Sequence, residues 1–189
     1  YGGDHCSTRP LSQKTLKKYP FLNAQYAFKV CRIEPENNIE MILEAFAQAD
    51  KIPLVLIGNW NNSVFGRQIK SKYQDFETIY LLDPIYDQDV LNEIRSNCEF
   101  YIHGHSAGGT NPSLVEAMCL NLPIIAYDVS YNRMTTANSA TYFKNSSDLI
   151  SLLKNTNSES LAQNKAEMHR IAKENYNWKK IAENYAQLF

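Results

Sequence analysis

Three of the seven glycines in this chain fall between residues 104 and 109. This cluster follows an apolar run and leads into Asn111-Pro112-Ser113, which opens a stretch of helical periodicity. Pro112 suits a first helical turn, and Thr110, Asn111 or Ser113 can cap it. Free amides at the positive end of a helix favour an anion, of which diphosphate is the usual one. A tight turn explains two of the glycines equally well, so this pattern alone is weak evidence.

Arg32 is a second signal for an anion, because it directly follows the apolar run 27–31. Its planar fork of donors matches phosphate oxygens. A lone arginine at a strand end is more often part of a surface ion pair. However, the carboxyl ends of parallel strands meet at one edge of a sheet, so Arg32 and the glycine cluster should lie on the same side. Together they favour a nucleotide diphosphate.

Other polar residues are candidates for the same region. Glu116, about one turn into the predicted helix, is either a solvated carboxylate or an acceptor for ribose hydroxyls. His103 and His105 should share one face of an extended segment. No cysteine or carboxylate stands at ligand spacing, and an open zinc site needs about three protein ligands. We therefore expect a hydrogen-bonded pair of histidines in a pocket and no metal.

Two aromatic residues also follow predicted strands. Trp60 either lines the cleft, where it would stack on a base, or anchors its loop. Tyr86 is a further candidate for the base side of the site.

A parallel sheet must position these residues. Six short apolar runs, mostly bounded by Gly, Pro, Asn or Asp, are typical of buried parallel strands: 27–31, 54–57, 79–82, 100–103, 124–127 and 141–143. Between them lie stretches whose apolar residues recur at the helical period. Such alternation predicts right-handed crossovers and an α/β, Rossmann-like fold with helices on both faces of the sheet.

The two ends of the chain differ from this pattern. The first 26 residues are polar, with one short helix predicted in 11–19, so we divide the chain into a lead-in segment, 1–26, and a Rossmann-like domain, 27–189. After about residue 146 the pattern is helical. The last helix carries an apolar stripe formed by Trp178, Ile181, Tyr185 and Leu188. We expect this stripe to pack on the domain's own core; the alternative is a surface for a missing partner domain.

Composition limits the function classes. A length of 189 residues fits one domain, and a net charge of −1 gives no basic excess for binding nucleic acid. The apolar runs are too short to cross a bilayer. The four cysteines have no C-x-x-C spacing, which favours buried thiols in a reducing, cytoplasmic compartment. The chain begins at Tyr1 without a signal peptide, so we expect a processed protein or a piece of a longer one.

Two motifs carry a family resemblance. R-I-x-P-E-N-N at 32–38 and G-G-T-N-P-S-L-x-E-A-M-x-x-x-x-P-I-I-A at 108–126 resemble the C-terminal, donor-binding domain of retaining GT-B glycosyltransferases, the group-1 or family-four class. The likeness covers roughly 27–189 and is greatest to bacterial polysaccharide and rhamnosyl-type transferases. It implies transfer of a sugar from a UDP-, GDP- or TDP-linked donor to an acceptor hydroxyl in bacterial surface polysaccharide synthesis.

The resemblance also implies roles for individual residues. Arg32 would bind the donor diphosphate and Glu116 the ribose, and we take these two as the catalytic candidates. The amides of Gly109, Thr110 and Asn111 would hold the donor sugar or phosphate. We extend this loop to the range from Gly108 to Ser113 and include Asn37 among the substrate-binding candidates. The class generally needs no metal or other cofactor. The N-terminal acceptor domain of the class would be missing from this chain. Peripheral association of the full-length enzyme with a membrane is a further partner that the resemblance allows.

Two positions depart from the class. A second carboxylate usually stands eight residues before Glu116, where this chain has Gly108. A lysine usually stands five residues after the arginine, where this chain has Asn37. The phosphate clamp therefore has one positive charge fewer and the sugar pocket one acceptor fewer. His105 and Ser106 are the nearest polar candidates to fill this gap.

A nucleotide-sugar epimerase of the same architecture and a non-catalytic nucleotide-binding module remain alternatives. An oxidoreductase is disfavoured, because no G-x-G-x-x-G follows the first strand.

Overall fold

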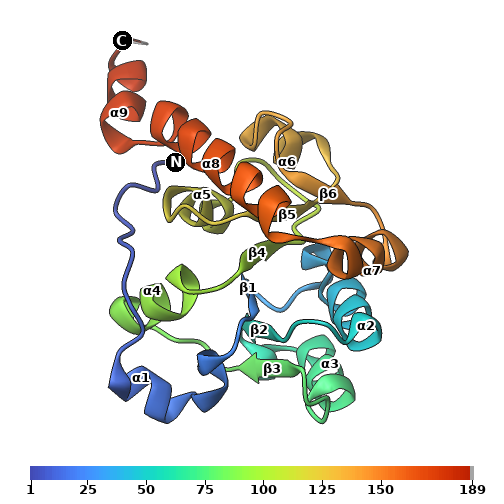
Figure 1. Cartoon of the computed structure of the whole chain (residues 1–189). Helices are drawn as coiled ribbons and strands as arrows, with labels where there is room; N and C mark the ends of the chain where they lie inside the picture. The colour runs from blue at the N-terminus through green and yellow to red at the C-terminus, as the bar shows by residue number, and fades with distance from the viewer. Residues whose placement is uncertain (188–189) are drawn as a thin grey trace.

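A six-stranded, fully parallel sheet forms the centre of the computed structural model, which describes residues 1–187 (Figure 1). The strands are β1 (Ala27–Val30), β2 (Leu54–Ile57), β3 (Ile79–Leu82), β4 (Phe100–His103), β5 (Ile124–Tyr127) and β6 (Thr141–Phe143). Each coincides with a predicted apolar run, except that β1 ends one residue earlier, at Val30. The predicted Rossmann-like fold is confirmed.

The order of the strands is β3-β2-β1-β4-β5-β6. In the central pairs, Phe28 lies opposite Val55 of β2 and Tyr101 of β4. The chain builds outward in one direction from β1 through β2 to β3, and in the other from β4 through β5 to β6. The order therefore reverses between β1 and β4. In open α/β sheets, ligands bind in the crevice at the carboxyl ends of the two strands that flank such a switch point.

Helices cover both faces of the sheet (Figure 1). On one face lie α2 (Ile39–Ala49), α3 (Val64–Tyr73) and α7 (Ser146–Asn155); on the other lie α4 (Gln88–Ser96), α5 (Pro112–Cys119) and α8 (Ser158–Asn175). α2 packs against α7 and α5 against α8. Each face has its own apolar core. Burying one large aliphatic side chain in such a core contributes roughly 1.5–3 kcal/mol to the free energy of folding.

Short elements complete the connections. They are α1 (Gln13–Lys18), α6 (Ser130–Thr135) and three turns of 3-10 helix, η1 (Pro20–Asn23), η2 (Pro35–Asn37) and η3 (Trp60–Asn62). α1 lies inside the stretch predicted to be helical. No helix in residues 1–187 has the length and apolar character needed to cross a membrane.

The first 26 residues lie along the face formed by α4, α5 and α8. The Gly3 amide donates to the Tyr176 carbonyl, the Ser12 hydroxyl donates to Glu93, and Leu22 and Tyr26 belong to the core of that face. Their separation from the domain as a lead-in segment stays a prediction.

The last helix does not pack as expected. In α9 (Trp178–Ala186) no residue is buried, and the side chains of Trp178 and Tyr185 are 46% and 64% exposed. Figure 1 shows α9 beyond the end of α8, away from the sheet. The prediction that this stripe covers the domain's own core is wrong, because the chain turns at Asn177 before α9 reaches the sheet. Leu188, the fourth residue of the stripe, lies outside the described residues.

The cysteines are four free thiols. Only Cys98 is buried, whereas Cys6, Cys31 and Cys119 are half-buried. The expectation of buried thiols therefore holds for Cys98 and is wrong for the other three: Cys6 lies in the irregular segment before α1, Cys31 directly follows β1, and Cys119 is the last residue of α5.

Candidate functional site

A cavity of about 260 Å³ opens at the switch point between β1 and β4. It is lined by Lys29, Val30, Cys31, Arg32, Asn37, His103, His105, Asn111, Pro112 and Ser113. The structure thus brings together Arg32, Asn37, His105, Asn111 and Ser113 from the set predicted from sequence. No carboxylate is among the lining residues, so the cavity is suited to an anion.

The start of α5 forms one wall of this cavity. Asn111 is the N-cap, and its side-chain oxygen accepts a hydrogen bond of 3.0 Å from the Ser113 amide. Pro112 occupies the first helical position, as predicted. Of the three predicted caps, Asn111 is the one observed. The positive end of the α5 dipole therefore faces the cavity.

Arg32 lies at the mouth. Its side chain is 73% exposed, and its guanidinium is 3.5 Å from the Glu34 carboxylate. Exposed ion pairs of this kind contribute little, so the guanidinium remains available to a ligand. Arg32 also borders a neighbouring cavity of about 330 Å³, which is lined on its far side by the 86% exposed Tyr86.

The Asn37 side chain links the Arg32 backbone to the His105 ring inside the site. It is buried, its amide nitrogen donates to the Arg32 carbonyl at 2.9 Å, and its amide oxygen lies 3.2 Å from Nδ1 of His105. Because an amide oxygen can only accept, Nδ1 of His105 donates, and Nε2 of the neutral ring is left as an acceptor. Burial, and next to it the charge of Lys29, hold the pKa of His105 below its usual value, which favours this neutral form.

The loop after β4 is tied to the loop after β1. The amide and the hydroxyl of Ser106 both donate to the Glu36 carbonyl, at 2.8 and 2.9 Å. The Asn38 side chain donates to the Gly104 carbonyl at 2.8 Å. A Cβ on Gly104 would lie 2.4 Å from the Asn37 carbonyl oxygen, so only glycine fits. Ser106 therefore supports the loop and does not line the cavity.

The tip of this loop is open. Gly108 has φ +96°, a conformation that favours glycine, whereas a Cβ on Gly109 would meet no described atom within 4 Å. Gly108, Gly109 and Thr110 are all exposed and lie outside the cavity lining. Their predicted contacts with the donor stay predictions.

Glu116 has a different set of neighbours. Its carboxylate accepts from Nη1 of the buried Arg95 at 2.5 Å and from the Tyr1 hydroxyl at 2.7 Å, and it is 3.5 Å from Nε2 of His5. It does not line the cavity. Sequence reasoning missed Arg95, for which the only signal was a basic residue in the last turn of a predicted helix. The ribose role of Glu116 stays a prediction.

One group in residues 1–187 has three metal-type ligands close together, since the ligand atoms of His5, Cys6 and Glu116 lie within 4.8 Å of one another. The charge of Arg95 on Glu116 disfavours a cation there. Burial raises the pKa of the Cys6 thiol to about 11, which keeps the sulfur protonated. These residues are therefore poorly suited to a metal.

The two histidines differ from the predicted hydrogen-bonded pair. His105 is bonded to Asn37, but His103 is buried and neither of its ring nitrogens has a hydrogen-bond partner within the described chain. Burial, and then the charges of Lys29 and His105, lower the pKa of His103. The prediction is wrong for His103, because its ring is buried and no hydrogen-bonding group of the described residues reaches either ring nitrogen.

Trp60 anchors its loop. It is fully buried, and its indole nitrogen donates to the Leu82 carbonyl at 2.8 Å. The interpretation of Trp60 as a cleft or base-stacking residue is therefore wrong.

Lys29 was not singled out from the sequence. It stands in the middle of β1, it is 1% exposed, and it lines the cavity. The signal available was a charged residue inside an otherwise apolar strand.

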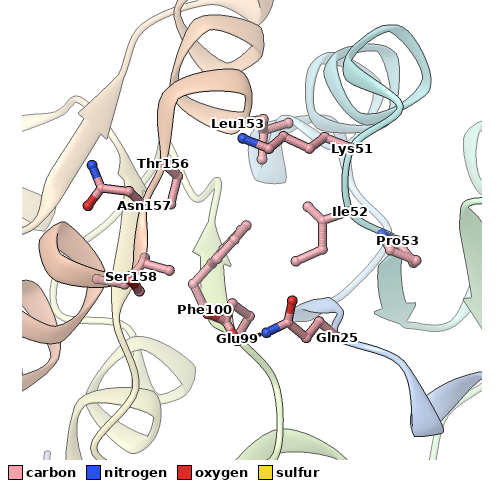
Figure 2. A pocket seen from close by; sticks show the side chains of 11 residues that line it. Gln25, Lys51, Ile52, Pro53, Glu99, Phe100, Leu153, Thr156, Asn157 and Ser158 are labelled. Carbon is pink, nitrogen blue, oxygen red and sulfur yellow. Dashed lines mark hydrogen bonds between the residues drawn. The ribbon is translucent and has the colours of Figure 1, made fainter.

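A cavity of about 290 Å³ lies at the opposite edge of the sheet (Figure 2). Pro53 and Glu99, which precede β2 and β4, face Thr156 and Asn157 in the turn between α7 and α8 and Ser158 at the start of α8. Polar groups there are satisfied internally: the Lys51 ammonium donates to the Lys154 carbonyl, and Gln25 donates to Glu99. Ligands of such sheets bind at the other edge, so we do not place the site here.

A family model described as "Glycosyl transferases group 1" matches residues 13–185. The chain belongs to this family. An uncharacterized glycosyltransferase from Methanocaldococcus jannaschii is 24% identical to this chain over 178 residues, which cover 85% of the chain and 44% of the relative. The chain therefore spans less than half the length of this relative.

Solved structures show the same fold at low identity. The Anabaena protein HepE, in complex with UDP and glucose, superposes with a TM-score of 0.78 at 13% identity, over 95% of this chain and 53% of HepE. The C-terminal domain of a glycosyl transferase group 1 protein from Francisella tularensis has a TM-score of 0.69 at 13% identity, over 89% of this chain and 96% of that one. The fold of this group 1 domain is thus that of a GT-B C-terminal domain.

Proposed function

We propose that this chain is the donor-binding domain of a glycosyltransferase that moves a sugar from a nucleoside diphosphate sugar to an acceptor hydroxyl. The observation that carries the proposal is the switch-point cavity, where Arg32 and the start of α5 converge without a carboxylate among the lining residues. Family membership supports the reaction class, and the HepE complex with UDP and glucose supports the type of donor.

In this proposal the diphosphate lies between Arg32 and α5. As the bond to the sugar breaks, negative charge builds up on the leaving diphosphate. The Arg32 guanidinium and the α5 dipole stabilise that charge, and the dipole is held in place by the helix itself. His105 presents its free Nε2 to a hydroxyl of the donor sugar, in a direction fixed by Asn37.

The nucleoside would occupy the neighbouring cavity. That cavity shares Val30, Cys31 and Arg32 with the first, so a diphosphate bound to Arg32 leads directly into it. The exposed ring of Tyr86 offers a surface on which a base can stack. Glu116 would bind the ribose through Oε1. The Tyr1 hydroxyl and His5 would then have to give up their contacts with this oxygen.

The biological setting is a finer part of the proposal. The G-G-T-N-P-S motif favours a rhamnosyl-type transferase of bacterial surface polysaccharide synthesis. The free thiols favour the cytoplasm. The share of HepE and of the Methanocaldococcus relative that the chain covers supports an additional N-terminal domain that binds the acceptor.

The test is nucleotide binding measured by calorimetry with UDP, GDP and dTDP. Replacing Arg32 by Ala removes a charge-assisted hydrogen bond, so we expect affinity for the best nucleotide to fall by about 1.5–3 kcal/mol, roughly 10- to 100-fold. Arg170→Ala, which removes an exposed arginine on α8, is the matched control and should leave affinity unchanged. Equal affinities for the Arg32 variant and the wild type would refute this assignment of the site.

A further inference from the structure

Lys29 is a charged residue in the middle of a buried parallel sheet. It lies on β1 opposite Leu56 of β2, its side chain is 1% exposed, and it lines the switch-point cavity. A lysine in such a position normally pairs with a carboxylate, since burying an unpaired ammonium group is costly.

No such partner is present among the residues that the structure describes. None of the ion pairs formed within residues 1–187 involves Lys29, and no carboxylate lines the cavity. The Cys31 thiol is the neighbour that partly offsets the effect of burial on the pKa of Lys29, which is nevertheless lowered. The charged form of Lys29 therefore lacks a counter-charge from the protein.

The other groups around the cavity also favour an anion. His103, from β4, is buried with both ring nitrogens unpartnered within the described part of the chain. Arg32 stands at the mouth of the same cavity, and the positive end of α5 forms its wall. An anion inside the cavity would give Lys29 the counter-charge that the protein does not provide, and Arg32, whose pairing with Glu34 is exposed, could contact the same anion from the mouth.

We propose that Lys29 is the second cation of the diphosphate site, acting from the interior of the sheet while Arg32 acts from the mouth. It would supply the charge that the family resemblance places at position 37, where this chain has a neutral asparagine. Asn37 in turn braces Arg32 and His105. This inference rests on the proposed function, because it assumes that the anion in the cavity is the donor diphosphate.

The first test uses Lys29→Met, which keeps the length of the apolar stem and removes the charge. Lys51→Met is the matched control, because it removes one exposed lysine at the opposite edge of the sheet. With inorganic pyrophosphate as the probe, calorimetry should show affinity reduced about 10- to 100-fold by Lys29→Met and unchanged by Lys51→Met.

Thermal unfolding of the same variants separates binding from structure. If Lys29 serves the ligand, removing its unpaired charge should leave the midpoint of the free chain unchanged or raise it, while the affinity falls. If Lys29 is only structural, the midpoint should fall and the affinity of the folded variant should equal that of the wild type, which would overturn the proposal.

A further test measures proton uptake when the wild-type chain binds a nucleotide. Lys29, lowered in pKa by burial, should gain a proton when an anion binds, so binding the best nucleoside diphosphate should take up protons between pH 7.5 and 9.5. The other titrating groups that face Lys29 are Cys31, His103 and His105, and the imidazoles remain neutral in this range. Calorimetry in two buffers of different ionisation enthalpy measures the uptake. Its absence at pH 7.5, 8.5 and 9.5 would refute the inference.

The outcomes of these experiments also separate a failure of this inference from a failure of the proposed function. If nucleotides bind and Arg32→Ala weakens them but Lys29→Met does not, the function stands and the role of Lys29 is refuted. If pyrophosphate binds through Lys29 but no nucleoside diphosphate binds more tightly than pyrophosphate, Lys29 is an anion-binding residue and the proposed donor class is wrong.

Discussion

Two cavities of similar size lie at opposite edges of the same sheet, about 260 Å³ at the carboxyl ends of the strands and about 290 Å³ at the amino ends. At the amino edge, Lys51, Gln25 and Asn157 are each hydrogen-bonded within the chain. At the carboxyl edge, His103 is buried with neither ring nitrogen hydrogen-bonded within residues 1–187, and Lys29 is buried with no carboxylate among the residues that line the cavity. The two cavities therefore differ in the state of their polar groups and in strand direction and hardly in volume, and it is the first two properties on which the proposed site rests.

The largest expected effect concerns turnover, because in the proposed function the carboxyl-edge cavity is only one wall of the complete transferase site. The chain alone should bind a nucleoside diphosphate weakly and transfer no sugar, since transfer needs donor and acceptor held together in a gap that excludes water. Adding an N-terminal half should restore turnover from none to a measurable rate. Acceptor-dependent transfer by the 189-residue chain alone would contradict this prediction.

The next effect concerns the packing that shapes the carboxyl-edge cavity. Gly104→Ala places a methyl group against the Asn37 carbonyl, so we expect a loss of about 1–3 kcal/mol in the free energy of unfolding, together with weaker nucleotide binding. Gly109→Ala, in open space on the same loop, should change stability by less than about 0.5 kcal/mol. Urea denaturation compares the two variants. Equal losses would show that the contact at Gly104 does not shape the site.

A matched pair of helix caps compares the two edges directly. Asn111 caps α5 at the carboxyl-edge cavity, and Asn157 caps α8 at the amino-edge cavity by accepting from the Ser160 amide. Each Asn→Ala change should lower the free energy of unfolding by roughly 0.5–2 kcal/mol. Only Asn111→Ala should also weaken nucleotide binding. A loss of affinity in the Asn157 variant would mean that the amino edge takes part in binding.

The smallest expected effect is on the pH dependence of folding. The pKa values of His103 and His105 are lowered in the folded chain, so the unfolded chain binds more protons below about pH 6.5. Their contribution to stability is therefore complete above that pH and is lost as pH falls, by at most about 1.4 kcal/mol per pH unit for each histidine. Urea denaturation at pH 7.0 and 5.5 should show a smaller difference for His103→Gln than for the wild type. No histidine lines the amino-edge cavity, so Asn157→Ala should keep the wild-type difference.

Local sequence patterns were sufficient for the strands and for the start of α5. Alternating apolar runs and helical periods mark elements whose residues are neighbours in the chain, and Pro112 with Asn111 fixes a helix start within three residues. Because parallel strands share one edge, the joint position of Arg32 and α5 was also predictable.

Only the tertiary structure decided which groups are satisfied and which are not. Glu116 meets Tyr1 across 115 positions and Arg95 across 21, and Asn37 reaches His105 across 68. Such pairings depend on how separate elements pack, and no local period encodes them. The same holds for α9, whose apolar stripe has a helical pattern although none of the residues of α9 is buried. Lys29 was visible in the sequence as a charge in an apolar strand, but packing alone showed that it lies beside a cavity without a carboxylate.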